Sequence, residues 1–482
     1  MNLSSKSSRN NEVHNVGYLP KIEIATQENI TLTTPGAPAI LAVVGTAKWG
    51  DMNTVQSFSS YATLLQYFKA DKSGLTLAKA TDLAYMNGAS TVKCVRIGAA
   101  GAAKSVKSFA GAGAVPDVIT VSAKYKGTYG DNVAVTILTK GSGRTMTVTD
   151  GKTTEYFTNN NNANGYASNA EIAAAVNLNS SLATIAVNNA ALVTAVTLTY
   201  LTGGNDGVSG LAFSDVTTAF DNVLKLEDFD ILLLPEWTSD ADHATMVAKL
   251  DARAATDKKF AIFMAGPAVN ESIATQKART SVGSRLALCS PNAMYKPSYA
   301  TVAIQFDGTY LAAAVAGQIA RRDVESAVTR KSLTVAGIMA DSTVSKKYYT
   351  NDEMEELLGV GIIPVSLING EIKVARGVTR VSDLSSVFYE LNIQRIVDYV
   401  KAQVNVKLDP FLGEANLDRV LNRMARVVDG VLQQDVLDEV LAAYNPTEVV
   451  LGVSPDTVNV NMSVQPTFAI NFINVTLAIT RI

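Results

Sequence analysis

Apolar positions along the chain form several short, uninterrupted runs separated by stretches of helical periodicity. Runs that end in turn-forming residues are typical of strands buried on both faces of a parallel sheet. They occupy residues 39–50, 90–98, 229–235, 259–267 and 284–291. Helical periodicity is found at 57–69, 74–87, 214–225, 239–254 and 307–322. This alternation predicts an α/β domain.

The middle of the chain changes pattern. Residues 99–114 consist almost entirely of Ala, Gly, Ser and Lys, which is typical of a domain boundary. Residues 115–205 are rich in Thr, Asn, Val and Gly, with strand-like alternation, a hairpin turn at Asp150-Gly151 and a short helix near 168–177. The pattern predicts a small β-sandwich-like domain inserted into the α/β domain.

The last third mixes both kinds of element. Thr350 and Glu353 form a capping box, so we interpret the acidic run 352–356 as charge at the positive end of a helix dipole. A metal or catalytic cluster is the alternative for this run. Residues 361–380 indicate a hairpin that turns at Asn369-Gly370.

Two amphipathic helices follow, at 387–404 and 414–432. The residues of the second helix that we expect to face inward are Leu417, Leu421, Met424, Val428 and Val431. Another set on this helix, at spacing i, i+4 and i+7, forms a basic stripe and consists of Arg419, Arg423 and Arg426. The stripe is either a contact for an acidic partner or a solvated helix face.

The two ends of the chain carry strands without an evident partner. Residues 21–24 alternate and are separated from the next element by a Pro- and Gly-containing stretch. The tail from residue 457 also alternates, and its parity changes at Ile473, which predicts a bulge or bend. The apolar residues that need a partner edge are Ile22, Ile24, Val475, Leu477 and Ile479. They pair either with another chain or with their own domain.

These patterns divide the chain into four parts. We expect an N-terminal arm at 1–38, a discontinuous α/β domain at 39–100 plus 206–345, an inserted β domain at 101–205, and an α+β C-terminal domain at 346–482 that ends in an arm strand.

Composition narrows the classes of function. The 482 residues contain 41 Lys+Arg and 44 Asp+Glu, for a net charge of -3. A protein that coats nucleic acid needs a basic excess, so we expect no direct contact with nucleic acid. The longest apolar run, near 311–317, is far shorter than the ~20 residues of a membrane span. We therefore expect no stable membrane insertion.

Candidate chemistry is sparse. Gly151-Lys152-Thr153 resembles the end of a phosphate loop, but Met146 stands where the leading Gly is needed and the context is a predicted hairpin. A Ser/His/Asp triad would need His14 or His243, and we expect His243 to be solvated on its helix. We predict no catalytic residue, metal site or cofactor. A hydrolase with a β accessory domain stays the weaker alternative.

Several segments in the same order resemble the contractile tail sheath proteins of tailed bacteriophages. The clearest is 201–207, which matches the LxGGxDG segment of that family. Segments 119–137, with Gly130-Asp131-Asn132 at its turn, and 348–380 are also similar to it. So are 39–50, 87–97 and 466–479. The family's GVYVEE-like entry strand is replaced here by residues 20–24, which keep the strand pattern without the Gly and the paired acids.

The resemblance implies a structural protein rather than an enzyme. Its α/β domain would be subtilisin-like in fold without the protease triad, and its terminal strands would add to the sheets of neighbouring subunits. Hexameric rings would stack as a sleeve around an inner tube, with baseplate and tail terminator proteins at the ends. The expected location is the virion, after synthesis and assembly in the host cytoplasm. The sheath of a bacterial injection system or of a phage-tail-like bacteriocin is the alternative.

Overall fold

The buried strands form one large sheet and place apolar side chains on both of its faces. In β1 (Leu41–Gly45), Leu41 and Val43 belong to one core cluster, whereas Ala42 and Val44 belong to another. Successive side chains of a strand point to opposite faces, so a strand that is apolar throughout must be covered on both sides. The computed structural model describes residues 39–69, 75–159, 162–297, 300–451 and 458–471.

The large sheet has eight strands in the order β18-β17-β13-β12-β11-β1-β3-β2. Its inner strands are parallel, and β2 and β18 pair antiparallel at the two ends. The other strands span Val55–Phe58 (β2), Val92–Arg96 (β3), Ile231–Leu233 (β11), Ile262–Ala265 (β12), Leu286–Ser290 (β13), Ile362–Ile368 (β17) and Glu371–Val374 (β18). The five predicted apolar runs supply five of these strands.

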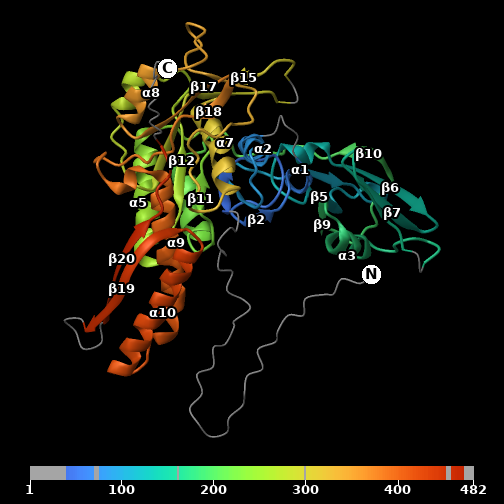
Figure 1. Cartoon of the computed structure of the whole chain (residues 1–482). Helices are drawn as coiled ribbons and strands as arrows, with labels where there is room; N and C mark the ends of the chain where they lie inside the picture. Colours follow the sequence, from blue (N-terminus) through green and yellow to red (C-terminus); the bar gives the residue numbers. More distant parts are fainter. Residues whose placement is uncertain (1–38, 70–74, 160–161, 298–299, 452–457, 472–482) are drawn as a thin grey trace, which may run out of the picture.

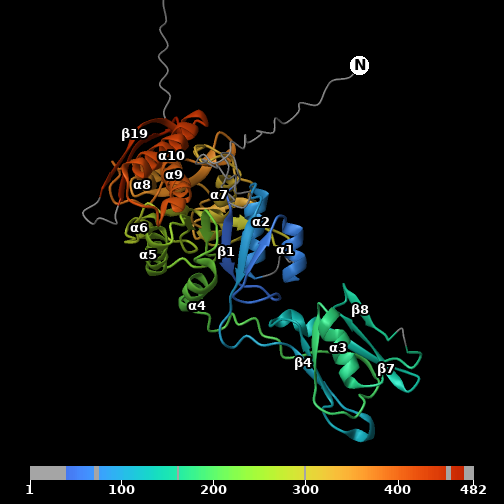
Figure 2. The same ribbon diagram turned by 90° about the horizontal axis from the view of Figure 1, so that it is seen from below.

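Helices cover both faces of this sheet (Figures 1 and 2). One face carries α1 (Tyr61–Phe68), α2 (Thr76–Met86) and α7 (Gly308–Ala320). The other carries α4 (Phe213–Ala219), α5 (Asp240–Thr256) and α8 (Asn351–Leu358), with the short α6 (Ile273–Lys277) beside α8. A small antiparallel sheet of β14 (Asn292–Tyr295), β15 (Ile304–Gln305) and β16 (Gly337–Met339) completes this part.

The insertion segment, residues 101–205, forms two antiparallel sheets. One contains β4 (Val106–Phe109), β5 (Ile119–Ala123) and β9 (Ala183–Val187). The other contains β6 (Ala134–Lys140), β7 (Gly143–Thr149), β8 (Thr154–Phe157) and β10 (Val196–Tyr200). The two sheets and α3 (Asn169–Asn179) enclose one hydrophobic core. The insertion lies at the opposite end of the molecule from α9 and α10 (Figure 2).

A single tryptophan joins the insertion segment to the large sheet. Trp49 follows β1 in sequence, is 1% exposed and belongs to the core of the insertion. Its ring meets those of Tyr125 and Tyr129 edge-on, with centroids 5.3 and 5.4 Å away. Beside it, the buried Arg96 guanidinium donates to the carbonyl oxygens of Gly50 and Lys126, both at 2.7 Å. The insertion is therefore packed onto the α/β part and not merely linked to it.

The C-terminal module consists of α9 (Leu391–Leu408), α10 (Asp418–Leu437), β19 (Leu441–Leu451) and β20 (Val458–Pro466). The two helices and the two-stranded sheet share one core cluster.

Local signals place several of these elements well. The Asn369-Gly370 hairpin is confirmed: both residues have positive φ, 52° and 83°, between β17 and β18. The predicted helix at 57–69 is wrong in its first part, because residues 55–58 form edge strand β2 and Ser60 caps a helix that begins at Tyr61. The four-part domain division stays a prediction.

We predict that Trp49→Ala lowers the free energy of unfolding by about 3–5 kcal/mol, because it empties a fully buried aromatic site shared by two parts of the fold. Urea unfolding measures the change. Trp237→Ala is the matched control, since Trp237 is only partly buried against Phe213, and its loss should be smaller. An equal loss in both variants would contradict the joining role of Trp49.

Candidate assembly site

The strand pair β19–β20 is the clearest candidate site. The two strands are antiparallel, with register shifts between Leu441 and Ala443 and between Asn445 and Glu448. Among the described residues they form a sheet of their own, so each strand has a ladder partner on one side only. Their outer edges therefore carry backbone N–H and C=O groups that a further strand can pair with.

The pair buries one face and exposes the other. In β20 the side chains of Val460, Met462 and Val464 pack against the core of the C-terminal module. The intervening residues, Asn459, Asn461, Ser463 and Gln465, are exposed. The alternation predicted for 458–464 is confirmed. The apolar face of the sheet is thus covered by helices of its own chain. The outer strand edges are therefore the part of the sheet that is available for assembly.

The chain beyond β20 is attached to two places. Thr467 donates its backbone N–H to the oxygen of Val440 at 3.2 Å and its hydroxyl to the oxygen of Glu439 at 2.7 Å. Asn471 Nδ2 donates to Glu390 Oε1 at 3.2 Å, near the start of α9. Between them Phe468 and Ile470 are 53% and 81% exposed. Large apolar side chains at this point favour cover by another chain.

The exchange residues named from the sequence, Ile22, Ile24, Val475, Leu477 and Ile479, lie outside the described residues. Their pairing stays a prediction.

The basic stripe on α10 lies on the surface. Arg419, Arg423 and Arg426 are all exposed, and the guanidinium of Arg423 lies 4.8 Å from the centre of the Phe411 ring. Among the described residues none of the three forms an ion pair. One inward prediction is wrong: Leu417 precedes the first residue of α10 as its N-cap and is 45% exposed.

The carboxyl edge of the large sheet, where open α/β folds usually bind ligands, is occupied by internal bonds. Tyr310 donates its hydroxyl to Glu236 Oε1 at 2.7 Å, and Lys79 Nζ lies 3.3 Å from the same oxygen. Asp307 caps α7 by accepting from the N–H of Thr309 at 2.9 Å. These polar groups hold the helices α2 and α7 and the strand β11 together.

His243 is buried, so the prediction that it is solvated is wrong. Its side chain is 0% exposed, because it lies on the side of α5 that packs onto β12. Nε2 donates to the oxygen of Trp237 at 3.0 Å, and Nδ1 accepts from Arg279 at 3.2 Å. Burial, with the adjacent Arg279 charge, lowers the pKa of His243 to about 4. Both ring nitrogens are engaged, so the residue is not placed to activate a nucleophile.

The other candidate motifs have structural roles. Thr350 and Glu353 form the predicted capping box at the start of α8, and Glu353 also pairs with Lys346. Gly151 lies in the predicted hairpin turn, between β7 and β8. Within the described residues no group of His, Cys, Asp and Glu is arranged to hold a metal ion. The helices in that part of the chain include none that is long and apolar enough to cross a membrane.

Comparison with known proteins places the fold. No family model and no curated protein match the sequence. Solved structures do: a sheath tail protein from Listeria innocua matches with a TM-score of 0.70 at 15% identity, over 91% of this chain and 94% of that one. A sheath tail protein from Desulfitobacterium hafniense gives 0.67 at 16% identity, over 93% and 97%.

The likeness extends to a second group of sheaths. The helical sheath of the anti-feeding prophage in its contracted state matches with a TM-score of 0.56 at 12% identity, over 97% of this chain and 99% of that one. The chain therefore has the fold of contractile sheath proteins, a mixed α/β architecture with several sheets. The resemblance seen in the sequence is confirmed as a likeness of fold.

One buried carboxyl group lies within the C-terminal module. Asp435 on α10 is 1% exposed, and its Oδ1 accepts from Gln403 Nε2 at 3.0 Å while its Oδ2 has no partner among the described residues. Burial is the main cause that raises the pKa of Asp435 to about 6, and Asp438 adds to it. The stabilisation from this raised pKa is complete below about pH 4 and is lost as the pH rises through about 6.

We predict that Asp435→Asn raises the free energy of unfolding by about 2 kcal/mol at neutral pH and leaves it nearly unchanged at about pH 4. Thermal unfolding across this pH range measures the difference. Asp418→Asn, the same change at an exposed position in the first turn of α10, should instead lower the free energy of unfolding by at most about 1 kcal/mol at neutral pH, because it removes a negative charge from the positive end of the helix. A gain of equal size at both pH values would argue against titration of Asp435 as its cause.

Proposed function

We propose that the protein is the structural subunit of a contractile tail sheath. It polymerises as stacked hexameric rings around an inner tail tube and contracts to drive the tube through a target cell envelope. The observation that carries this proposal is the two-stranded sheet β19–β20, whose outer edges have no strand partner within the described residues, in a chain with the fold of sheath proteins.

Strand exchange supplies the missing partners. An arm strand from a neighbouring subunit adds to an edge by main-chain hydrogen bonds, and its alternating side chains set the register. Each bond contributes about 0.5–1.5 kcal/mol net, so a strand with about four or five bonds holds neighbours together while the rest of each subunit moves. Residues 21–24 and 473–482 are the proposed arms, with Ile22, Ile24, Val475, Leu477 and Ile479 as the buried contacts.

The wider setting follows from the same proposal. The other partners are the tube protein, a baseplate and a tail terminator, the role is non-enzymatic, and the protein is made and assembled in the host cytoplasm before it forms part of the virion. In this proposal the α/β part is a subtilisin-like domain and the insertion segment a β-sandwich. The sheath of an injection system or a bacteriocin is the second candidate, favoured by the likeness to the anti-feeding prophage sheath.

Deletion of residues 470–482 tests the exchange. Wild-type protein should form tubes with a regular helical repeat in negative-stain electron microscopy, and the truncated chain should form none of comparable length, because one arm per subunit is lost. Deletion of the polar residues 1–12 is the control and should leave tubes intact. An unchanged melting temperature in both variants excludes misfolding. If the variant that lacks residues 470–482 still formed long ordered tubes, the strand-exchange hypothesis would be wrong.

The basic stripe is the proposed contact with an acidic tube surface. Replacing Arg419, Arg423 and Arg426 together by Glu should reduce co-sedimentation with the tube protein at least tenfold at low salt, because attraction becomes repulsion. Replacing all three by Lys keeps the charge and should retain most binding. Equal binding by the two triple variants would show that the stripe is a solvated helix face.

A further inference from the structure

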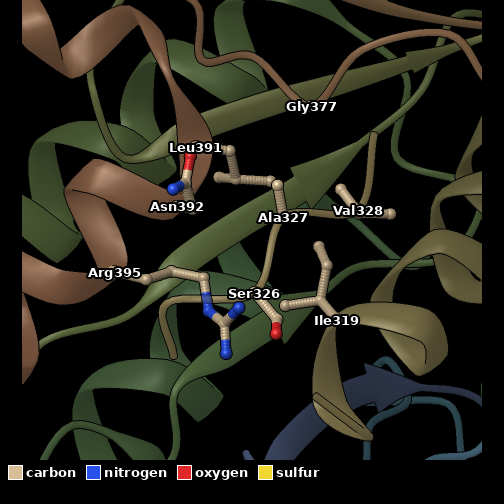
Figure 3. A pocket seen from close by; sticks show the side chains of 8 residues that line it. All are labelled: Ile319, Ser326, Ala327, Val328, Gly377, Leu391, Asn392 and Arg395. Carbon is tan, nitrogen blue, oxygen red and sulfur yellow. The ribbon is translucent and has the colours of Figure 1, made fainter. Parts of the chain in front are cut away.

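One sheet of the insertion segment has an open face. The inner face of the sheet β10-β6-β7-β8 closes the core of the insertion with Val135, Ile137, Met146, Val148 and Phe157. The side chains that alternate with these point away from the core, and we call the surface that they form the outer insertion face. By contrast, the hollow between the end of α7 and the start of α9 (Figure 3) has room for about one water molecule and is too small for an organic ligand.

The strand register arranges the outer insertion face in rows. In one row, Thr136 of β6 pairs with Thr147 of β7, which pairs with Tyr156 of β8. In the next row, Tyr200 of β10 pairs with Ala134 of β6. The two tyrosines therefore lie at opposite edges of the face, with threonines between them. Three strand spacings separate β10 from β8, so the tyrosines stand at least about 14 Å apart.

Large apolar side chains on this face are exposed to solvent. The exposed fractions are 74% for Tyr156, 56% for Leu138, 53% for Leu198 and 53% for Tyr200. Leu198 lies at a register shift of β10, between Val196 and Thr199, and such shifts re-aim side chains at the edge of a sheet. Single exposed apolar residues are ordinary, whereas several gathered on one face mark a binding surface.

The other outward side chains are polar and nearly all uncharged. On β6, β7 and β8 they are Thr136, Thr145, Thr147, Thr149, Thr154 and Lys140. Lys140 stands beside the turn between β6 and β7, at one end of the face. Within the described part of the chain, the hydroxyl groups of Thr136, Thr145 and Thr147 have no hydrogen-bond partner. The centre of the face thus offers free hydroxyl groups and no charge that an ionic partner needs.

The size of the outer insertion face favours a small ligand over a protein. Three strand spacings by about four residues of strand give a platform of roughly 200 Å². A stable contact between two copies of the chain buries about 800 Å² on each partner, so this platform supplies only about a quarter of the need. Threonine is also under-represented among the residues that dominate protein–protein binding. A short sugar chain needs no larger surface than this one.

We propose that the outer insertion face binds an uncharged oligosaccharide, with Tyr156 and Tyr200 as stacking platforms and the threonine hydroxyl groups between them as hydrogen-bond partners. A sugar ring presents C–H groups on its face, which pack on an aromatic ring, and hydroxyl groups on its rim, which bond to other hydroxyl groups. A flat platform fits an extended, ribbon-like chain. The ligand class is therefore a chain of neutral hexose or N-acetylhexosamine units.

The place of the insertion in the molecule gives this binding a role. The insertion lies at the opposite end from α9 and α10 (Figure 2), and α10 carries the basic stripe that we propose as the tube contact. In a sleeve, which rests on the proposed function, the outer insertion face then lies on the outside. A sleeve repeats the face many times, so weak single contacts add up on a surface that bears the glycan. The binding itself belongs to the free protein.

Affinity electrophoresis of the full-length protein tests the proposal. Native gels that contain hydroxyethyl cellulose or glycol chitin, two soluble uncharged polymers of these sugar units, should retard the protein in at least one case. Added salt should leave the retardation unchanged, because no charge pair takes part. Tyr156→Ala and Tyr200→Ala should each weaken binding at least about threefold, and the double variant at least about tenfold, because each removes a stacking ring.

Two further variants sharpen the test. Tyr348→Ala removes a tyrosine that is 37% exposed just before α8, outside the insertion, and should leave the retardation unchanged. Thr147→Val keeps the shape of the side chain and its preference for a strand but removes the central hydroxyl group, so it should weaken binding at least about twofold. Equal melting temperatures for these variants and the wild type exclude misfolding.

Three results would overturn the proposal. The first is wild-type migration that neither polymer changes, and the second is retardation that survives the loss of both tyrosines. The third is a wild-type dimer in sedimentation analysis that the double variant abolishes, which would assign the face to a second copy of the chain. Wild-type protein that forms no sleeves would instead overturn the proposed function and the multivalent role, and would leave the sugar-binding face standing.

Discussion

The outer edges of β19 and β20 are the constraint on which the proposed assembly depends. A backbone N–H or C=O group that is removed from water must be hydrogen-bonded, and a two-stranded sheet satisfies only its inner edge. The C-terminal module has already used its apolar face: Val460, Met462 and Val464 cover α9 and α10. The groups of the strand pair that stay available are the backbone N–H and C=O groups of its outer edges. Such groups can form hydrogen bonds with an extended segment of nearly any sequence. An arm strand suits these edges because it can pair with them without a rearrangement of the C-terminal module.

The helix α9 connects this edge to the rest of the protein. One side of it packs with α10 beneath the strand pair, and Asp398 on another side is bound by Arg285 at the start of β13. The chain that leaves β20 returns to the same helix, where Asn471 meets Glu390. In the proposed assembly, a force on the C-terminal arm strand acts on α9 through this bond.

Sequence patterns predicted the elements whose signals are local. The apolar runs became parallel strands, and Asn369-Gly370 and Thr350 with Glu353 formed the expected turn and cap. The strand β19 was missed because Asn445 and Pro446 interrupt its pattern. Such residues demote a strand, and the structure accommodates them by a register shift between Asn445 and Glu448. The burial of His243 depends on which side of α5 packs on the sheet, a long-range contact that helical periodicity alone does not specify.

The small net charge of the chain is also consistent with assembly into a sleeve. A net charge of -3 is small for 482 residues, and a sleeve of many copies would multiply a large one into self-repulsion. A chain with nearly zero net charge can still carry a local cluster of one sign. Positive charge is concentrated on the exposed side of α10 at Arg419, Arg423 and Arg426. Salt screens exposed charges within about 10 Å, so such a stripe acts on a surface in contact with it and little on distant copies. The proposed function calls for this combination, because a subunit that binds a tube closely must not repel its own neighbours.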